Sequence, residues 1–277
     1  MDAFQAIVLG IVQGLTEFLP ISSTAHLRIV PAFMGWEDPG AAFTAVTQLG
    51  TMAAVLLYFR EDLTRIGRAW LRSARSPRDR SLRSGLDARL GWYIVLGTIP
   101  IGIFGIAFKD QIETGARDLY LIGIALIVLG LVLLAAERVG KRDRSIEQIT
   151  TRDGVAVGFA QALALVPGVS RSGATITAGL FLGLDRTSAA RFSFLLSVPA
   201  VVLSGLLELG SIVSGEEGQH VGTGNLLLAT FLAFVSGYAA IAWMLRFLTS
   251  HSTVVFVVYR VALGALVLAL VGTGTID

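Results

Sequence analysis

A carboxylate inside an apolar stretch near the N-terminus is the first candidate for chemistry. Glu17 follows Gln13 by four residues, so the two side chains share one helix face, and Pro20 ends that helix just beyond them. A carboxylate near a helix C-terminus opposes the helix dipole and is costly to desolvate, so it requires a cation, an arginine partner or a proton. A structural glutamate, hydrogen-bonded within a helix bundle, is the alternative, but an acid inside a membrane is a functional candidate by default.

Two prolines are each followed by hydroxyl side chains. The cluster after Pro20 contains Ser22, Ser23 and Thr24 followed by His26, and the cluster after Pro167 contains Ser170, Arg171, Ser172 and Thr175. A proline ends one helix and a serine or threonine caps the next, which leaves backbone N–H groups free to bind an anion. Alternatively, these hydroxyls only donate hydrogen bonds to nearby main-chain carbonyls, but such a role does not explain why an arginine lies among them.

These two clusters together predict an oxyanion site. Arg171 offers a planar guanidinium that holds a phosphate through two hydrogen bonds, and Gly168 allows close backbone approach. The predicted anion ligands are Ser22, Thr24, Gly168, Ser170, Ser172 and Thr175.

The sequence around these clusters is apolar enough for a membrane. The chain has 277 residues, of which 54% are hydrophobic and 15% charged, whereas a soluble domain carries about 25% charged residues. A membrane-spanning helix needs about 20 mostly apolar residues, and six stretches provide them: 41–59, 90–108, 119–136, 189–213, 225–248 and 253–272. A disordered chain, a disulfide-stapled domain and a thiol enzyme are excluded, because the chain is this apolar and has no cysteine.

Two further apolar stretches, 3–33 and 154–184, are broken in the middle by the polar clusters. The segments IVQGLTEFLPISSTAH (11–26) and GFAQALALVPGVSRSGAT (158–175) share the order of apolar helix, glutamine, proline and hydroxyls. We therefore predict one all-α polytopic membrane domain over 1–277, with six transmembrane helices and two re-entrant helical hairpins. The first repeat covers 3–138 and the second, inverted repeat covers 154–272, so the polar site lies where the repeats meet.

The basic residues predict the orientation of this domain. The predicted loop 60–89 has nine arginines against four acids, and the predicted loop 137–153 is also basic, so both should be cytoplasmic. Segments 34–40, 109–118 and 214–224 have few basic residues and should face outward. Both termini are then outside. The net charge of +2 gives no reason to expect a nucleic-acid partner.

Several motifs give the chain a resemblance to a known family. QGLTEFLPISSTAHL (13–27), PGVSRSGAT (167–175), FSFLLSVPA (192–200) and the YR pair at 259–260 resemble the bacterial undecaprenyl-diphosphate phosphatases of the bacitracin-resistance family. The resemblance runs from about residue 4 to 272. It implies a multi-pass enzyme of the bacterial inner membrane that hydrolyses undecaprenyl diphosphate to undecaprenyl phosphate, the lipid carrier for peptidoglycan synthesis. It also implies an active site open to the outer face.

The resemblance further implies a divalent cation, Mg²⁺ or Ca²⁺. Glu17 is the best candidate ligand of this cation. The family has either glutamate or glutamine at the position of Gln13, and the glutamine of this chain is a weaker, neutral ligand. We therefore expect the metal to bind mainly with the substrate phosphates.

The catalytic roles fall on Glu17, Ser23, His26 and Arg171. Ser23 is the expected nucleophile, Glu17 takes its proton, and His26 protonates the leaving group or assists water. Attack by His26, with Ser23 binding a phosphate oxygen, and direct attack by water use the same anion site and stay open.

A competing function is a transporter or flippase of a polyprenyl phosphate lipid, because inverted repeats with broken helices are also a transporter architecture. An intramembrane serine protease is a weaker alternative, since it has no need of Arg171. The oligomeric state is left open, with a homodimer as one option.

Overall fold

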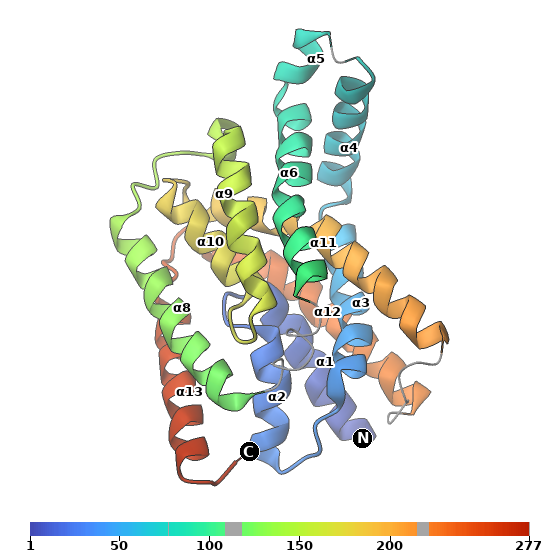
Figure 1. Cartoon of the computed structure of the whole chain (residues 1–277), viewed down its shortest axis with the longest axis vertical. Helices are drawn as coiled ribbons and strands as arrows, with labels where there is room; N and C mark the ends of the chain where they lie inside the picture. The colour runs from blue at the N-terminus through green and yellow to red at the C-terminus, as the bar shows by residue number, and fades with distance from the viewer. Residues whose placement is uncertain (77, 109–117, 215–221, 277) are drawn as a thin grey trace.

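A computed structural model of the chain describes residues 1–76, 78–108, 118–214 and 222–276, without the side chains of residues 41, 204 and 206–214. Helices form the whole framework of this part (Figure 1). They are α1 (Ala3–Phe18), α2 (Ser23–Met34), α3 (Gly40–Tyr58), α4 (Arg60–Arg75), α5 (Arg80–Ser84), α6 (Leu86–Ala107), α8 (Leu119–Val139), α9 (Thr151–Ala162), α10 (Arg171–Phe181), α11 (Arg186–Ser214), α12 (Thr223–Phe247) and α13 (Val254–Gly272), with short 3₁₀ turns at Ile146–Gln148 and Leu163–Leu165.

The six predicted spans coincide with α3, α6, α8, α11, α12 and α13. Helices α6, α8, α12 and α13 are each long and apolar enough to cross a membrane, and α3 makes a fifth span if it is counted together with α4. The protein is therefore an all-α polytopic membrane protein. The outward orientation predicted for 109–118 and 214–224 concerns segments of which residues 109–117 and 215–221 lie outside the described residues.

The arginine-rich segment 60–89 is largely helical rather than an irregular loop. Helix α4 bends by 74° from α3 and packs against the start of α6. Leu63, Ile66 and Trp70 recur at helical spacing, with Ile66 buried, while Arg68 and Arg72 are exposed. Acids in the first turn of α4 and arginines in its last turn also suit the helix dipole.

Two helix pairs correspond to the interrupted stretches 3–33 and 154–184. Helices α1 and α2 form a hairpin that opens toward the end of the molecule where both termini lie (Figure 1). Helices α9 and α10 form a second hairpin that opens toward the other end. The turns of the two hairpins meet in the interior, where Ser172 Oγ donates a hydrogen bond of 2.9 Å to the Leu19 carbonyl. The division into inverted repeats 3–138 and 154–272 stays a prediction.

Glycines allow the second hairpin to pack closely on α6. A Cβ added to Gly158 of α9 would lie 2.4 Å from the Cα of Gly97 on α6. The two helices therefore touch through their backbones, a device common in membrane helices. This contact fixes the helix that leads into the second break.

Candidate active site

The two breaks have the same local backbone structure. Ser22 is the N-cap of α2 with φ 75° and ψ 103°, and Ser170 is the N-cap of α10 with φ 67° and ψ 112°. Each serine hydroxyl accepts a hydrogen bond from the N–H three residues later, which belongs to Ala25 or Gly173. Positive φ at a residue other than glycine is strained and is typical of functional sites. The predicted capping of each second helix by a serine or threonine is thus present in the structure, at Ser22 and Ser170.

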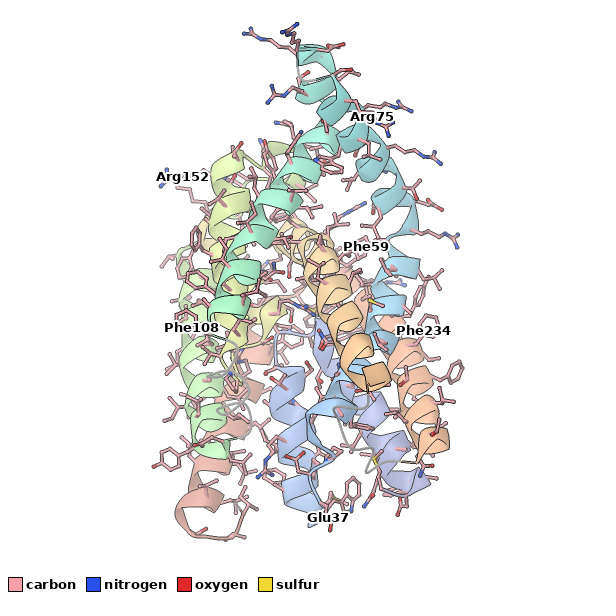
Figure 2. All side chains as sticks on the ribbon, turned by 45° about the vertical axis from the view of Figure 1, so that its right-hand side comes forward. Glu37, Phe59, Arg75, Phe108, Arg152 and Phe234 are labelled. Atoms are coloured by element: carbon pink, nitrogen blue, oxygen red, sulfur yellow. The ribbon has the colours of Figure 1, made fainter. Side chains whose placement is uncertain are left out.

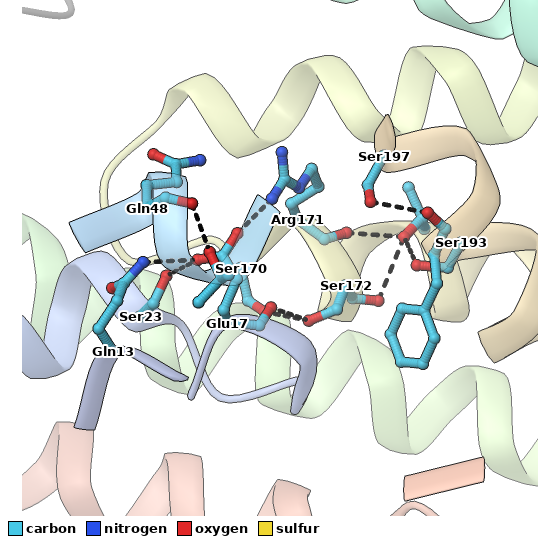
Figure 3. Close-up of polar contacts among 12 residues, drawn as sticks. Gln13, Glu17, Ser23, Gln48, Ser170, Arg171, Ser172, Ser193 and Ser197 are labelled. Carbon is cyan, nitrogen blue, oxygen red and sulfur yellow. Dashed lines mark hydrogen bonds and ion pairs between the residues drawn. The ribbon is translucent and has the colours of Figure 1, made fainter. Parts of the chain in front are cut away.

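Glu17 is the centre of the polar cluster between the hairpins (Figure 3). Its Oε2 accepts a hydrogen bond of 2.6 Å from Ser23 Oγ and a longer one of 3.4 Å from Gln13 Nε2. Its Oε1 forms an ion pair with Nη2 of Arg171, which comes from the opposite hairpin. Three predicted residues of the first hairpin and one of the second are therefore in one cluster, although Glu17 and Arg171 are 154 positions apart in the sequence.

The charged groups of this cluster are largely shielded from water. The Glu17 side chain is 8% exposed and the Arg171 side chain 16% exposed. A carboxylate so shielded from water is stabilised by an arginine partner and by hydroxyl donors. A serine hydroxyl that donates to a carboxylate has the geometry of a nucleophile beside its base.

The remaining hydroxyls divide into two groups. Ser22 and Ser170 pair with Thr24 and Ser172, in each case at 3.2 Å between hydroxyl oxygens. Thr24 is exposed at the start of α2, whereas Ser172 is buried and also joins the first hairpin through Leu19. The amide N–H groups of Ser170, Arg171 and Ser172 have no acceptor among the described residues, as expected at a helix start.

Thr175 and Gly168 have contacts that the sequence did not reveal. Thr175 is fully buried, and its hydroxyl contacts the carbonyl of Arg171 and the hydroxyl of Ser193 on α11. Gly168 has φ 83°, which suits glycine, and a Cβ there would lie 2.9 Å from the Ile122 carbonyl. In this structure both residues support the backbone of the second break, and their contact with a diphosphate stays a prediction.

His26 has a different setting from Glu17 and Ser23. Its Nδ1 is 2.7 Å from the Ser22 carbonyl, and its Nε2 is 2.7 Å from the hydroxyl of Tyr259 on α13. A carbonyl can only accept, so Nδ1 carries a proton, and in the neutral ring Nε2 accepts from Tyr259. The two rings are also stacked, with 5.6 Å between their centroids.

A divalent cation has two candidate oxygen ligands here. Gln13 is 1% exposed, and its Nε2 donates to the Glu17 carboxylate, while its Oε1 has no hydrogen-bond partner among the described residues. Among the described residues there is no group of three or more acidic, histidine or cysteine side chains that could hold a metal. This donor set fits a cation that takes its other ligands from substrate phosphates and water.

Sequence reasoning missed the main contacts of α13. Arg28 and Arg260 each place a charge inside an apolar stretch of the sequence, where an arginine either pairs with an acid or extends its guanidinium to the membrane surface. Arg28 does pair with Asp38, at 3.4 Å. Arg260 instead is fully buried and binds main-chain carbonyls, including those of Pro20 and Gly168. A charge inside the apolar run 253–272 was the available signal.

Known proteins match the chain along nearly its whole length. The family model described as "Bacitracin resistance protein BacA" matches residues 6–266. A protein of a Nocardioides species named undecaprenyl-diphosphatase is 57% identical, with 100% of this chain and 99% of the relative covered. The undecaprenyl-diphosphatase of Mycolicibacterium smegmatis is 56% identical with the same coverage, and undecaprenyl-diphosphatase 2 of Streptomyces avermitilis is 50% identical over 100% of this chain and 97% of the relative. Together with the paired breaks and their cluster, these matches show that the chain belongs to the bacitracin resistance protein BacA family.

Proposed function

We propose that this protein is a membrane phosphatase that hydrolyses undecaprenyl diphosphate to undecaprenyl phosphate and inorganic phosphate. The observation that carries the proposal is the Ser23–Glu17–Arg171 cluster, which joins a nucleophile, a base and a phosphate-binding guanidinium from two hairpins. The names of the relatives supply the substrate. The reaction regenerates the lipid carrier for peptidoglycan synthesis, which accounts for resistance to bacitracin in such a family.

In the first step Ser23 Oγ attacks the terminal phosphorus. Its proton passes to Glu17, which already accepts the hydrogen bond of that hydroxyl at 2.6 Å. The bond from this phosphorus to the bridging oxygen breaks, and undecaprenyl phosphate leaves. Arg171 and the free N–H groups of the two helix starts stabilise the charge on the phosphate oxygens.

In the second step water attacks the phosphoserine. Inorganic phosphate leaves, and Glu17 returns the proton to Ser23 Oγ. His26 is the candidate for proton transfer at the leaving group: as an imidazolium it would donate from Nε2, in place of the present contact with the Tyr259 hydroxyl, while Nδ1 stays on the Ser22 carbonyl. Ser23 is preferred to His26 as nucleophile because its hydroxyl contacts the carboxylate, whereas both His26 nitrogens have other partners.

A divalent cation, Mg²⁺ or Ca²⁺, is part of the proposal. The Glu17 carboxylate and the unpaired Oε1 of Gln13 would hold it together with the substrate. When bound, it neutralises charge on the diphosphate.

We place the enzyme in the bacterial inner membrane, with both termini outside and the active site open to the outer face. The arginine-rich end of the molecule, which includes Arg75 and Arg152, lies opposite the end that carries Glu37 (Figure 2). The positive-inside bias supports a cytoplasmic location for the arginine-rich end. Both termini are at the other end (Figure 1). A homodimer stays a prediction.

Phosphate release from undecaprenyl diphosphate by the purified protein tests the function. We expect turnover that a chelator lowers and added Mg²⁺ or Ca²⁺ restores. Glu17→Gln should lose turnover, since the amide cannot take the Ser23 proton. If the protein binds or moves the lipid without releasing phosphate, the proposed phosphatase function is wrong. Full activity in chelator would show that the divalent cation is not required.

A further inference from the structure

Arg260 is a buried cation whose hydrogen bonds go to the main chain. It is 0% exposed, and none of the ion pairs in the described part of the chain involves it. Its guanidinium nitrogens are 3.2 or 3.3 Å from the carbonyl oxygens of Pro20, Ala125, Leu126, Gly168 and Val169. Pro20 belongs to the first break, and Gly168 and Val169 to the second. One side chain therefore binds both breaks from α13.

Burying the charge of Arg260 in this position costs free energy, so its presence needs an explanation. Removing a cation from water into an apolar interior costs several kcal/mol, and carbonyl dipoles offset that cost less well than a carboxylate does. Apolar packing can hold helices together without a charge. The breaks that Arg260 contacts are also the helix starts whose N–H groups are predicted to bind an anion.

The peptide unit between Val169 and Ser170 links Arg260 to that anion site. In a trans peptide the carbonyl and the N–H point in opposite directions. The carbonyl of Val169 accepts from Arg260, so the N–H of Ser170 is directed away from the guanidinium. No acceptor for this N–H exists among the described residues. A cation at the carbonyl end polarises the unit and makes that N–H a stronger donor.

We propose that Arg260 is a positioning residue for the diphosphate. It fixes the two breaks relative to each other, so that Ser23 and the N–H groups at the start of α10 act on the same phosphate. Its charge also strengthens those N–H groups, although it does not itself reach the substrate. This inference rests on the proposed phosphatase function.

Gly173 provides a second way to disturb the same contact. A Cβ at this position would lie 2.8 Å from Arg260 Nη1 and 3.1 Å from Ser170 Oγ. Gly173→Ala therefore keeps the arginine but displaces its Nη1, the nitrogen that donates to the Pro20 carbonyl of the first break.

The experiment measures kcat, KM and thermal unfolding of purified Arg260→Lys, with undecaprenyl diphosphate as substrate. Lysine keeps the charge but has no planar fork to bridge both breaks. A misplacement of about 1 Å can cost about 10²-fold in rate, so we expect kcat to fall by about that factor, and by more than KM rises. Arg246→Lys is the matched control, because Arg246 is exposed near the end of α12, and it should behave like the wild type.

A purely structural role for Arg260 predicts a different result. Arg260→Lys would then melt at a lower temperature but keep the wild-type kcat per folded molecule, and this would overturn the inference while the phosphatase function stands. If Arg260→Lys does not fold, Gly173→Ala decides: a lowered kcat supports the inference and an unchanged kcat overturns it. A wild-type protein that releases no phosphate would overturn the function and the inference together.

Discussion

The ion pair between Arg171 and Glu17 connects the two hairpins through a single residue from each. Removing one preorganised electrostatic donor typically costs about 10²–10³-fold in turnover. We therefore expect Arg171→Ala to lose about this factor in phosphate release. Arg171→Lys should also be poor, because lysine keeps the charge but cannot bind a carboxylate and a phosphate in one plane.

Arg152→Lys is a suitable control for these variants. Arg152 lies in the same hairpin, at the exposed start of α9. Its substitution should leave turnover unchanged. Near-normal turnover in Arg171→Ala would mean that the second hairpin has only a structural role.

The nucleophile can be identified from the phosphorylated residue of a trapped enzyme intermediate. Because Ser23 Oγ donates to Glu17 at 2.6 Å, we expect an acid-stable phosphoserine from labelled substrate. Ser23→Ala should abolish turnover, whereas His26→Ala should leave a slow activity. Substantial turnover in Ser23→Ala, together with an acid-labile adduct on His26, would exchange the two roles.

Which residues gather at the site was predictable, but how each side chain is used was not. Glu17, Ser23 and Arg171 were predictable because a charge or a hydroxyl cluster beside a proline is unusual in an apolar stretch. The partners of Thr175 and His26 were not, since Ser193 and Tyr259 come from other helices and no sequence spacing relates them. Such contacts depend on tertiary packing alone.

Among the helices, hydropathy located all six predicted spans to within a few residues of α3, α6, α8, α11, α12 and α13. Long apolar runs must be helical in a membrane because their backbone groups have no other partners there. The helix at 60–75 was overlooked because its nine-arginine context suggested a loop. The apolar residues Leu63, Ile66 and Trp70 carried the helical period that was missed.

The contact between α6 and α9 gives a prediction for the second hairpin. In Gly158→Ala the new methyl would lie 2.4 Å from Gly97 Cα, so α9 must move away from α6. Overpacking of this kind costs about 1–3 kcal/mol. We expect a lower unfolding temperature in detergent and, because α9 leads into the second break, a lower kcat in the folded fraction.

Gly102→Ala on α6 is the matched control. A Cβ there meets nothing within 4 Å, and alanine is the better helix former by about 1 kcal/mol. The control should therefore be as stable as the wild type or slightly more stable. A Gly158→Ala protein that melts and turns over like this control would show that the close approach of α9 and α6 is not required.

The molecule as a whole is polarised along its long axis. Helices α4, α5 and α6 extend beyond the other helices at one end (Figure 1), and the segment 60–89 within them holds nine arginines. The N- and C-termini and Glu37 lie at the opposite end (Figures 1 and 2). This difference in charge predicts how the molecule is oriented in a membrane, because segments rich in arginine and lysine stay on the cytoplasmic side. The hairpin that carries Glu17 and Ser23 therefore opens toward the outer face in our proposal.

Single cysteines can test this orientation cleanly, since the chain has none of its own. Ser76→Cys places a thiol at the end of α4, and Glu37→Cys places one on an exposed residue near the opposite end. With a membrane-impermeant maleimide on intact cells, we expect Glu37→Cys to be labelled and Ser76→Cys to be labelled only after the membrane is permeabilised. Phosphate release by both variants confirms that the labelled protein is folded. Labelling of Ser76→Cys from outside, with Glu37→Cys protected, would reverse the orientation and place the opening of the first hairpin in the cytoplasm.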